Sequence, residues 1–280
     1  AHTVVEMQDG DTLRRNPYSL MGDPADQSSY SISVRRDDQG RGGSLFMHNQ
    51  CRVGMDIVIS NPINLFALDL RGRKHLMLAG GIGITPFLAQ IKQLAASNGR
   101  FELHYAARSA AHAAYADDLR VAHPGNVHIY HGDQDQRFDL EHLLDGQPLG
   151  THVYVCGPLR MIGQVRDTAA NLGWPREAVH SEEFLAPKSG KPFQVKLAVS
   201  NKVIEVGEHQ SLLEAIEAAG VEAPYLCRGG ACGQCETDVI GYDGKFLHND
   251  HWLDADARAS GKKIMPCVSR FEGKTLVLDR

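Results

Sequence analysis

Four cysteines near the carboxyl end of the chain have the spacing of an iron-sulfur ligand set. Three lie within nine residues as Cys-x4-Cys-x2-Cys, and the fourth follows thirty-two positions later. This spacing is typical of plant-type 2Fe-2S centres, in which four thiolates hold two irons, and glycines in the loop let backbone N–H groups face the sulfurs. A zinc site or plain structural cysteines are the alternatives, although structural zinc favours short, matched cysteine pairs. The expected iron ligands are Cys227, Cys232, Cys235 and Cys267.

A glycine-rich turn follows an apolar segment at 75–79 and precedes a helical one. Such a turn lets a pyrophosphate approach the backbone, and the N-terminus of the new helix favours its negative charge. The turn is not a P-loop, because no Gly-Lys-Ser/Thr follows, and it lacks the third glycine of G-x-G-x-x-G, where Pro86 stands. By itself it could be only a tight connection. The candidate nucleotide-binding residues are Gly80, Gly81, Gly83, Thr85 and Pro86.

Composition narrows the class of protein. The 280 residues are enough for two domains or three small ones, and the formal charge of -5 gives no electrostatic reason to bind nucleic acid or anionic lipid. No apolar run approaches the roughly 20 residues that span a bilayer. Six cysteines, three of them in one loop, fit a reducing compartment, so we expect a cytoplasmic protein with neither nucleic-acid nor membrane partners. The opening AHTVVEM shows no secretory leader, and the sequence leaves a leader upstream of Ala1 open.

The first 70 residues have the pattern of short strands. Period-two or apolar segments at 3–7, 28–36 and 53–60 are separated by turn signals. We therefore expect a small antiparallel barrel in residues 1–70. Three or four strands cannot close a barrel, so we also expect further strands upstream of Ala1.

From about residue 71 apolar strands alternate with helical segments. The expected strands are 75–79, 101–107, 127–130 and 153–156, with helices at 86–97, 112–121, 140–144 and 161–172. This alternation predicts a parallel sheet covered by helices in an α/β domain over residues 71–185.

A third domain is expected after a Pro, Lys, Ser and Gly linker at 186–192. Residues 193–280 resemble the plant-type ferredoxin domain, an α+β fold of the β-grasp type. The resemblance rests on CRGGACGQC, on the Cys267-Val-Ser-Arg that follows, and on a terminal strand at 275–278, after strands at 193–199 and 202–206 and a helix at 212–219. It implies a one-electron carrier with a potential of about -400 mV.

The nucleotide turn and a second motif together resemble the pyridine-nucleotide domain of the ferredoxin-NADP reductase superfamily. In that family a Cys-Gly-Pro turn lies beside the nicotinamide ring, which implies this role for Cys156, Gly157 and Pro158. Plain burial is the alternative for Cys156. Arg108, with the serine after it, could meet a ribose 2′-phosphate or a free hydroxyl pair. Family analogy favours NADH and leaves NADPH open.

A flavin is expected between the nicotinamide and the cluster, because a hydride carries two electrons and a 2Fe-2S centre accepts one. The run from Arg15 to Ser19 resembles the Arg-x-Tyr-Ser strand motif of flavin reductases, with one extra residue before Tyr18. Tyr18 could pack on the flavin ring and Ser19 could hydrogen-bond its edge, whereas Arg15 could instead be solvated.

A second flavin motif and an aromatic residue complete the candidate site. Gly42, Gly43 and Ser44, followed by His48, resemble the flavin-phosphate loop of these reductases. Phe184 matches the position where such reductases place an aromatic ring against the flavin or the nicotinamide, with a core phenylalanine as the alternative. No pair of histidines has a zinc-protease or Rieske spacing.

The order flavin, pyridine nucleotide, C-terminal 2Fe-2S resembles the phthalate dioxygenase reductase family. The resemblance implies a multidomain β, α/β and α+β protein that passes electrons from NADH through FMN and the cluster to a separate Rieske-type oxygenase. It places Ser19, Cys156 and Phe184 at the reacting centre and implies a monomeric reductase in a transient complex. The alternatives are a non-enzymatic 2Fe-2S carrier or sensor with vestigial nucleotide motifs, and a flavin reductase of the stand-alone or flavohaemoglobin type.

Overall fold

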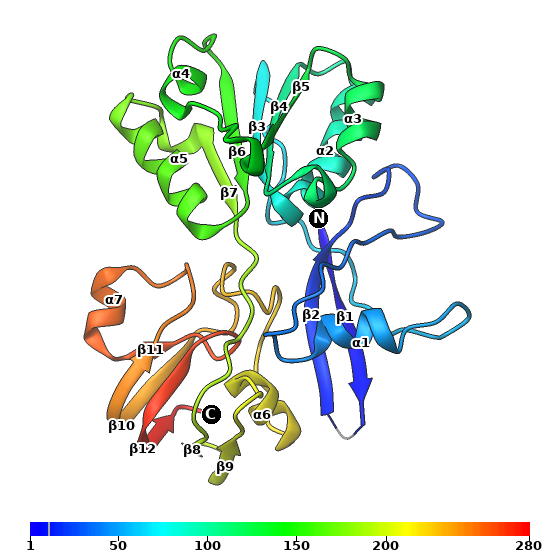
Figure 1. Cartoon of the computed structure of the whole chain (residues 1–280). Coiled ribbons are helices and arrows are strands. Elements are labelled where there is room, and N and C mark those ends of the chain that lie inside the picture. The colour runs from blue at the N-terminus through cyan, green and yellow to red at the C-terminus, as the bar shows by residue number, and fades with distance from the viewer. Residues whose placement is uncertain (11) are drawn as a thin grey trace. The chain divides into compact units, whose positions relative to one another are not determined.

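The computed structural model describes residues 1–10 and 12–280 (Figure 1). The chain forms two compact units. The first contains residues 1–2, 18–33 and 64–184, and the second contains residues 3–17, 34–63 and 185–280. The segment expected to bind flavin therefore contributes to both units, and the division into three domains with a linker stays a prediction.

The first unit is built on a five-stranded parallel sheet in the order β5-β4-β3-β6-β7. The strands are β3 (Lys74–Gly80), β4 (Phe101–Ala107), β5 (Val127–His131), β6 (Thr151–Cys156) and β7 (Val179–Glu182). The helices are α2 (Thr85–Ala96), α3 (Ala116–Ala122), α4 (Leu140–Leu144) and α5 (Leu159–Asn171), with the 3-10 turn η1 (Gly81–Ile84) before α2. The predicted alternation of strands and helices is confirmed.

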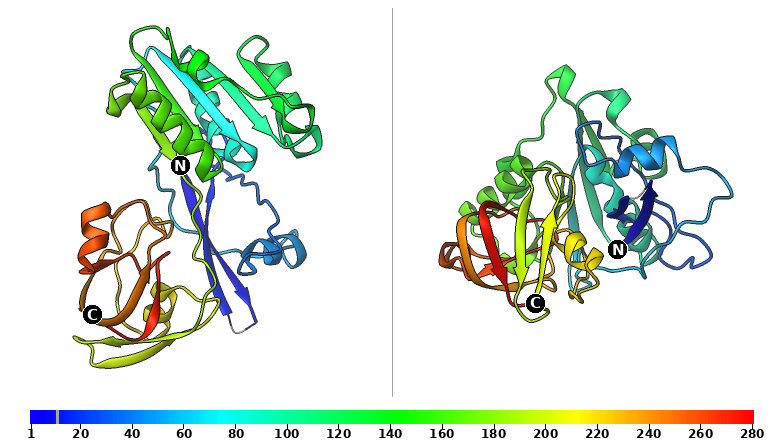
Figure 2. Two further views of the ribbon diagram at one scale, coloured as in Figure 1. Left: turned by 60° about the vertical axis from the view of Figure 1, so that its left-hand side comes forward. Right: turned by 90° about the horizontal axis from the view of Figure 1, so that it is seen from below.

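Both faces of this sheet are covered, as Figures 1 and 2 show. On one face Met77 and Ala79 of β3 join the core under α2 and α3. On the other, Leu76 and Leu78 pack with α4 and α5. Successive strand side chains point to opposite faces, so a strand buried on both sides reads as a continuous apolar run.

Two elements of the first unit differ from the prediction. The helix expected at 112–121 is a 3-10 turn, η2 (Ala110–His112), followed by α3, because Tyr115 between them has a left-handed φ of 64° that no α-helix accepts. Strand β7 was not predicted. It has four residues and a mixed polar sequence, VHSE, which carries no period-two signal.

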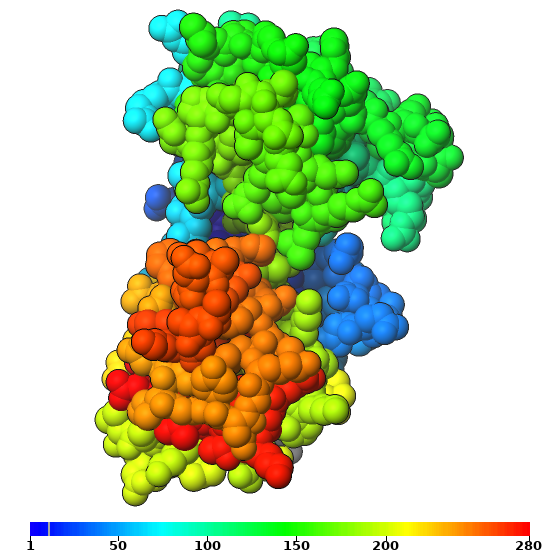
Figure 3. All heavy atoms as spheres, turned by 90° about the vertical axis from the view of Figure 1, so that its left-hand side faces the viewer, coloured from blue at the N-terminus to red at the C-terminus, as the bar shows by residue number. Residues whose placement is uncertain are grey.

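The second unit contains a mixed five-stranded sheet in the order β11-β10-β12-β8-β9. Strands β12 and β8 are parallel, and the other neighbours are antiparallel. Figure 3 shows the surface that β10, β12 and α7 form, in orange and red. The elements are β8 (Phe193–Leu197), β9 (Lys202–Val206), α6 (Leu212–Ala218), β10 (Thr237–Leu247), α7 (Ala255–Ser260), β11 (Lys263–Ile264) and β12 (Arg270–Leu278).

Helix α6 packs on this sheet and covers its core. Leu212, Leu213 and Ile216 are buried against strand residues such as Val195 and Phe271. Its start is fixed by a capping box, in which Ser211 accepts from the N–H of Glu214 while the Glu214 carboxylate accepts from the N–H of Ser211. One sheet and one covering helix agree with the β-grasp expectation.

The remaining elements are the two-stranded sheet of β1 (His2–Asp9) and β2 (Thr12–Ser19), and helix α1 (Gly43–Asn49). The strands predicted at 28–36 and 53–60 are wrong as regular strands. Only an isolated bridge joins Val5 to Ile59, and Ser60 donates its N–H to the Val4 carbonyl at 2.9 Å. A segment with strand character becomes a strand only where a neighbour completes its ladder of hydrogen bonds. In the described part of the chain, no helix has the length and apolar character needed to cross a membrane.

Candidate cofactor sites

The four predicted iron ligands come together in the second unit. Cys227, Cys235 and Cys267 are buried, Cys232 is partly exposed, and none of the four forms a disulfide. The thiol of Cys232 hydrogen-bonds Cys227, which with nearby N–H groups lowers the pKa of Cys227 to about 5. In the same way Cys267 lowers the pKa of Cys235. The shared hydrogen bonds show that the sulfurs lie in two close pairs, Cys227 with Cys232 and Cys235 with Cys267.

The cysteine loop folds tightly enough that only glycine fits at two positions. Gly230 and Gly233 have φ values of 73° and 77°. A Cβ on Gly230 would lie 2.7 Å from Val268 Cγ2, and a Cβ on Gly233 would lie 2.3 Å from the Trp252 ring. The N–H of Gly229 donates to Cys227 Sγ at 3.4 Å. Four convergent sulfurs with backbone donors aimed at them fit a 2Fe-2S cluster.

The two nucleotide motifs lie against one another in the first unit. Strands β3 and β6 are neighbours, so the turn after β3 meets the Cys-Gly-Pro turn after β6. A Cβ on Gly80 would lie 2.7 Å from Pro158 Cδ, and a Cβ on Gly83 would lie 2.3 Å from the Cys156 carbonyl oxygen. A Cβ on Gly157 would lie 3.0 Å from the Gly80 Cα atom. These glycines are needed for the close approach of two backbones.

These turns lie where the strand order of the sheet reverses. The chain runs from β3 outward through β4 to β5, then returns to place β6 on the other side of β3. Ligands of open α/β sheets bind at this switch point, outside the carboxyl ends of the strands. Gly81 has a φ of 54° and open space where a Cβ would point, Pro86 fits the first turn of α2, and Thr85 donates to the Ile82 carbonyl. Arg108 is exposed directly after β4, at the same edge of the sheet.

A residue that the sequence did not single out lies beside Cys156. Glu182 pairs with Cys156 across β6 and β7, and its Oε2 atom is buried with no hydrogen-bond partner among the described residues. Burial raises the pKa of Glu182 to about 7, and burial together with Glu182 and Glu183 raises the pKa of the Cys156 thiol. An acidic residue in a short, polar strand gives no signal of burial in the sequence. Glu182 is a candidate hydrogen-bond acceptor at the nucleotide edge.

The raised pKa of Glu182 has a consequence for stability. The folded protein holds this proton between about pH 4.5 and 7 while the unfolded chain releases it, so Glu182 makes the fold less stable as the pH rises through this window. We expect Glu182→Gln to raise the free energy of unfolding by up to about 3 kcal/mol at pH 8 and to change it little at pH 4. Thermal unfolding at both pH values, with the exposed Glu177→Gln as control, measures the difference. Parallel pH profiles of E182Q and wild-type protein would contradict the expectation.

On β2, Arg14 rather than the predicted Arg15 lies beside the glycine turn. Arg15 is held by carboxylates, with Nε 2.6 Å from Glu6 Oε1 and Nη1 3.1 Å from Glu217 Oε2. Arg14 instead lies beside Gly42, where a Cβ would be 3.2 Å from the Arg14 Nε. Consecutive side chains of a strand point to opposite faces, so only one of the two arginines can face this glycine turn.

Arg14 and the glycine turn are a candidate cradle for an anion. The Nε and Nη1 atoms of Arg14 are buried without a hydrogen-bond partner among the described residues, although the Asp9 carboxylate lies 4.0 Å from Nε as a longer ion pair. Gly42 has a φ of 102°, and a Cβ on Gly43 would lie 2.3 Å from the Asn16 amide nitrogen. Buried, unsatisfied guanidinium donors are costly unless an anion binds them. The predicted Ser44 hydroxyl exchanges hydrogen bonds with the Asp37 backbone.

The residues expected to contact the flavin or nicotinamide ring belong to the first unit. Ser19 is buried, Tyr18 is partly buried, and Phe184 is 47% exposed. The exposure of Phe184 removes the alternative of a core phenylalanine and leaves its ring available to a cofactor. The candidate anion cradle of Arg14 and Gly42 belongs to the second unit.

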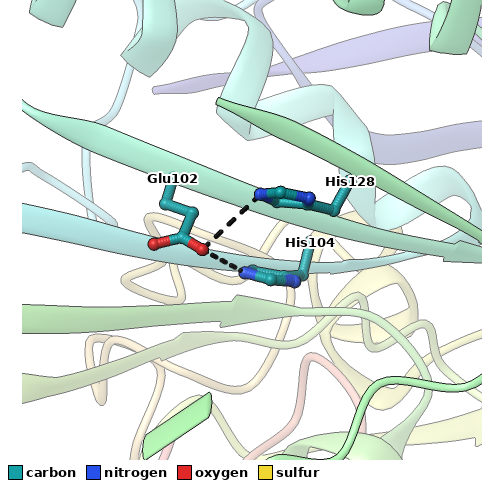
Figure 4. A group of neighbouring side chains, drawn as sticks. All are labelled: Glu102, His104 and His128. Carbon is teal, nitrogen blue, oxygen red and sulfur yellow. Dashed lines mark hydrogen bonds and ion pairs between the residues drawn. The ribbon is translucent and has the colours of Figure 1, made fainter. Parts of the chain in front are cut away.

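A group of Glu102, His104 and His128 on β4 and β5 was not predicted (Figure 4). Glu102 Oε1 lies 2.9 Å from His104 Nε2 and 3.6 Å from His128 Nε2. Its other oxygen accepts from Lys74 at 2.6 Å, and His104 Nδ1 lies 2.9 Å from the Tyr130 hydroxyl. Burial lowers the pKa of His104. The Lys74 ammonium already balances the carboxylate, so the group is a satisfied hydrogen-bond network rather than a cation site.

The fold and these sites define a class. A glycine turn and a Cys-Gly-Pro turn at the switch point of a parallel sheet, with a four-cysteine loop on a second unit, are the parts of a pyridine-nucleotide oxidoreductase with a 2Fe-2S centre. Two family models match the chain. One is the N-terminal domain of the dimethylamine monooxygenase subunit DmmA-like proteins, over residues 57–179, and the other is the 2Fe-2S iron-sulfur cluster binding domain, over residues 195–272.

Similar proteins and structures extend over the whole chain. The carnitine monooxygenase reductase subunit of Acinetobacter baumannii is 46% identical over 100% of this chain and 87% of that protein. The heme-dependent oxidative N-demethylase beta subunit of Ectopseudomonas mendocina is 46% identical over 100% and 88%. The solved structure of phthalate dioxygenase reductase superposes with a TM-score of 0.89 at 36% identity, covering 100% of this chain and 87% of that one. The chain belongs to the phthalate dioxygenase reductase family of oxygenase reductase components.

Family membership confirms the expected fold class and the expected kind of reaction. The protein is an oxidoreductase that uses a pyridine nucleotide, a flavin and a 2Fe-2S centre to deliver electrons to an oxygenase component. A non-enzymatic carrier with vestigial nucleotide motifs does not agree with the intact packing of both nucleotide turns.

Proposed function

We propose that this chain is an NADH-dependent reductase that passes electrons through FMN and its 2Fe-2S centre to a Rieske-type terminal oxygenase. The observation that carries the proposal is the meeting of Gly80, Gly83 and the Cys156–Pro158 turn at the switch point of the sheet, in a chain that also gathers four cysteines. Relatives described as reductase subunits of monooxygenases and dioxygenases support it.

The proposed function gives each candidate residue a specific role. A bound flavin takes up the electron pair of the reduced nicotinamide and releases the electrons one at a time. Gly81, with open space where a Cβ would point, admits the nucleotide pyrophosphate to the backbone, and Gly83 lets the turn after β6 come close. Cys156 is 0% exposed and supports the Gly157–Pro158 turn from below the nicotinamide position. Ser19 offers a hydroxyl to the flavin edge, and Phe184 shields the reacting faces from water.

The choice of FMN and NADH is supported by local chemistry. One buried arginine at a glycine turn suits the terminal monophosphate of FMN. A ribose 2′-phosphate would need Arg108 together with a hydroxyl donor, but the Ser109 hydroxyl is 2.7 Å from His112 Nδ1 and is already engaged. NADH is therefore the proposed donor, and comparison of kcat/KM for NADH and NADPH tests it.

Arg14 should hold the flavin phosphate. We expect Arg14→Gln to weaken FMN binding at least tenfold, since a charge-assisted bidentate contact to phosphate is lost. Arg15→Gln should keep most of the flavin, because its guanidinium is bound by Glu6 and Glu217. Flavin content per chain and FMN titration of the apoprotein measure both effects. The opposite ranking would return the role to Arg15.

A second candidate acceptor has its own support. One relative that is 46% identical is the beta subunit of a heme-dependent oxidative N-demethylase, and one matched family model is named for a dimethylamine monooxygenase subunit. A haem-containing oxygenase component is therefore the alternative partner. Anaerobic mixing of the NADH-reduced protein with a Rieske-type component or with a haem component, followed at their absorption bands, decides between them.

The decisive experiment for the proposed function is spectroscopic. A purified protein with FMN, two irons and two sulfides per chain should oxidise NADH and reduce cytochrome c, whereas a carrier or sensor should not consume NADH. We also propose a monomeric cytoplasmic reductase, which light scattering and cell fractionation test. Material that holds zinc in place of iron and sulfide would overturn the electron-transfer assignment.

A further inference from the structure

Helix α6 carries two carboxylates that bind two arginines from the amino-terminal part of the chain. Glu214 and Glu217 lie three positions apart and therefore share one face of the helix. Arg41, just before α1, forms a bidentate pair with Glu214, at 2.7 Å and 3.2 Å. Arg15, on β2, lies 3.1 Å from Glu217. All these residues belong to the second unit.

The pair between Arg41 and Glu214 is removed from solvent. The two side chains are 8% and 9% exposed, and Arg41 also donates to the His209 carbonyl at 2.9 Å. Burial alone would raise the pKa of Glu214, but the hydrogen bonds from Arg41 and Ser211 hold it below its usual value. A bidentate, buried ion pair is weakly screened by salt and fixes orientation.

Glu217 is also joined to the cysteine loop. Arg228 follows Cys227 directly, is 4% exposed, and donates to both oxygens of Glu217. Its guanidinium lies 3.7 Å from the centre of the Tyr225 ring. One carboxylate therefore connects β2, the strand that contains Tyr18, with the residue next to a candidate iron ligand.

We propose that α6 is an internal docking helix, which through Glu214 and Glu217 binds Arg41 and Arg15 and holds the cysteine loop close to the candidate flavin-phosphate cradle. The inference rests on the proposed function, since the docked arrangement serves the passage of electrons from flavin to cluster. One electron leaves the reduced flavin, and one ferric ion of the cluster becomes ferrous. Without the docking contact the cluster domain stays tethered, but only a fraction of molecules has the transfer geometry at any moment.

The test uses Glu214→Gln in the full-length, cofactor-loaded protein. Gln keeps the capping box of α6 and removes only the charge that binds Arg41. We expect reduction of the flavin by NADH to be unchanged and reduction of the cluster to slow at least tenfold, both followed by anaerobic stopped-flow absorbance. Hydrogen exchange of residues 212–218 and of α1, which follows Arg41, should become faster, which is a readout independent of turnover.

Two further proteins make the result specific. Glu205→Gln makes the same charge change on an exposed residue of β9 and should leave both cluster reduction and exchange as in the wild type. The double variant Arg41→Gln, Glu214→Gln should show the same increase in hydrogen exchange as either single variant, as expected for partners in one contact. Wild-type exchange in E214Q would overturn the docking contact, and wild-type cluster reduction would overturn its role in transfer. If NADH fails to reduce the flavin of the wild-type protein, the proposed function is contradicted. The comparison of hydrogen exchange would still decide whether the docking contact exists.

Discussion

Cys267→Ser is expected to abolish cluster assembly while leaving the flavin half of the protein active. A serine hydroxyl has the shape of the thiol but does not ionise as readily, so it is a poor ligand for iron. Iron and sulfide should fall from about two per chain to near zero. The rate of NADH-dependent cytochrome c reduction should fall at least a hundredfold, whereas ferricyanide reduction, which takes electrons from the flavin, should stay within about twofold.

The surroundings of Cys267 hold this position in place. The residue is 2% exposed, and a network on its carboxyl side fixes the backbone, with Ser269 donating to Asp250 Oδ1 at 3.0 Å and accepting from the N–H of Asn249 at 3.2 Å. Asp250 also accepts from the N–H of Leu253 at 2.9 Å. Cys51→Ser, outside the loop, is the matched control and should keep the iron. A C267S protein with a normal 2Fe-2S spectrum would remove Cys267 from the ligand set.

The motifs that could be predicted from the sequence are local ones. The cysteine spacing and the glycine turns depend on neighbouring residues in the chain, and the structure brings each set together as expected. The alternation of strands and helices after residue 71 follows from hydrophobic periodicity, and the four predicted strands agree with β3 to β6 to within a few residues at each end. The order of these motifs along the chain then led to the resemblance to the phthalate dioxygenase reductase family, which implied FMN and the oxygenase partner.

The features that could not be predicted depend on register and on distant pairing. Arg14 and Arg15 are adjacent on β2, so a shift of one residue exchanges the faces that they occupy, and a motif with one extra residue cannot settle which faces the glycine turn. The pairing of Arg41 with Glu214 joins residues 173 positions apart. Neither residue type nor sequence spacing predicts this ion pair. The half-buried Glu182 is a further example, because its neighbour Cys156 lies on strand β6, far from it in the sequence.

Gly83→Ala is expected to disable the nucleotide site more severely than a methyl group added at Gly80 or Gly157. The new Cβ would lie 2.3 Å from the carbonyl oxygen of Cys156 and 2.8 Å from the N–H nitrogen of Gly157, and neither backbone atom can rotate away as a flexible side chain could. The turn after β3 or the turn after β6 must then move. Overpacking of this kind costs about 1–3 kcal/mol of stability, and a shift of 1 Å at the nicotinamide can slow hydride transfer about a hundredfold.

The prediction for Gly83→Ala separates the nucleotide site from the cluster. Anaerobic reduction of the flavin by NADH should slow about a hundredfold, while dithionite should still reduce flavin and cluster, because the cysteine loop belongs to the other compact unit. Gly163→Ala in α5 is the control, since nothing lies within 4 Å of its new Cβ and alanine favours a helix. Wild-type flavin reduction in G83A, with an unchanged melting temperature, would mean that the two turns are not held as closely as the structure places them, and the nicotinamide would then have to be sought away from Cys156.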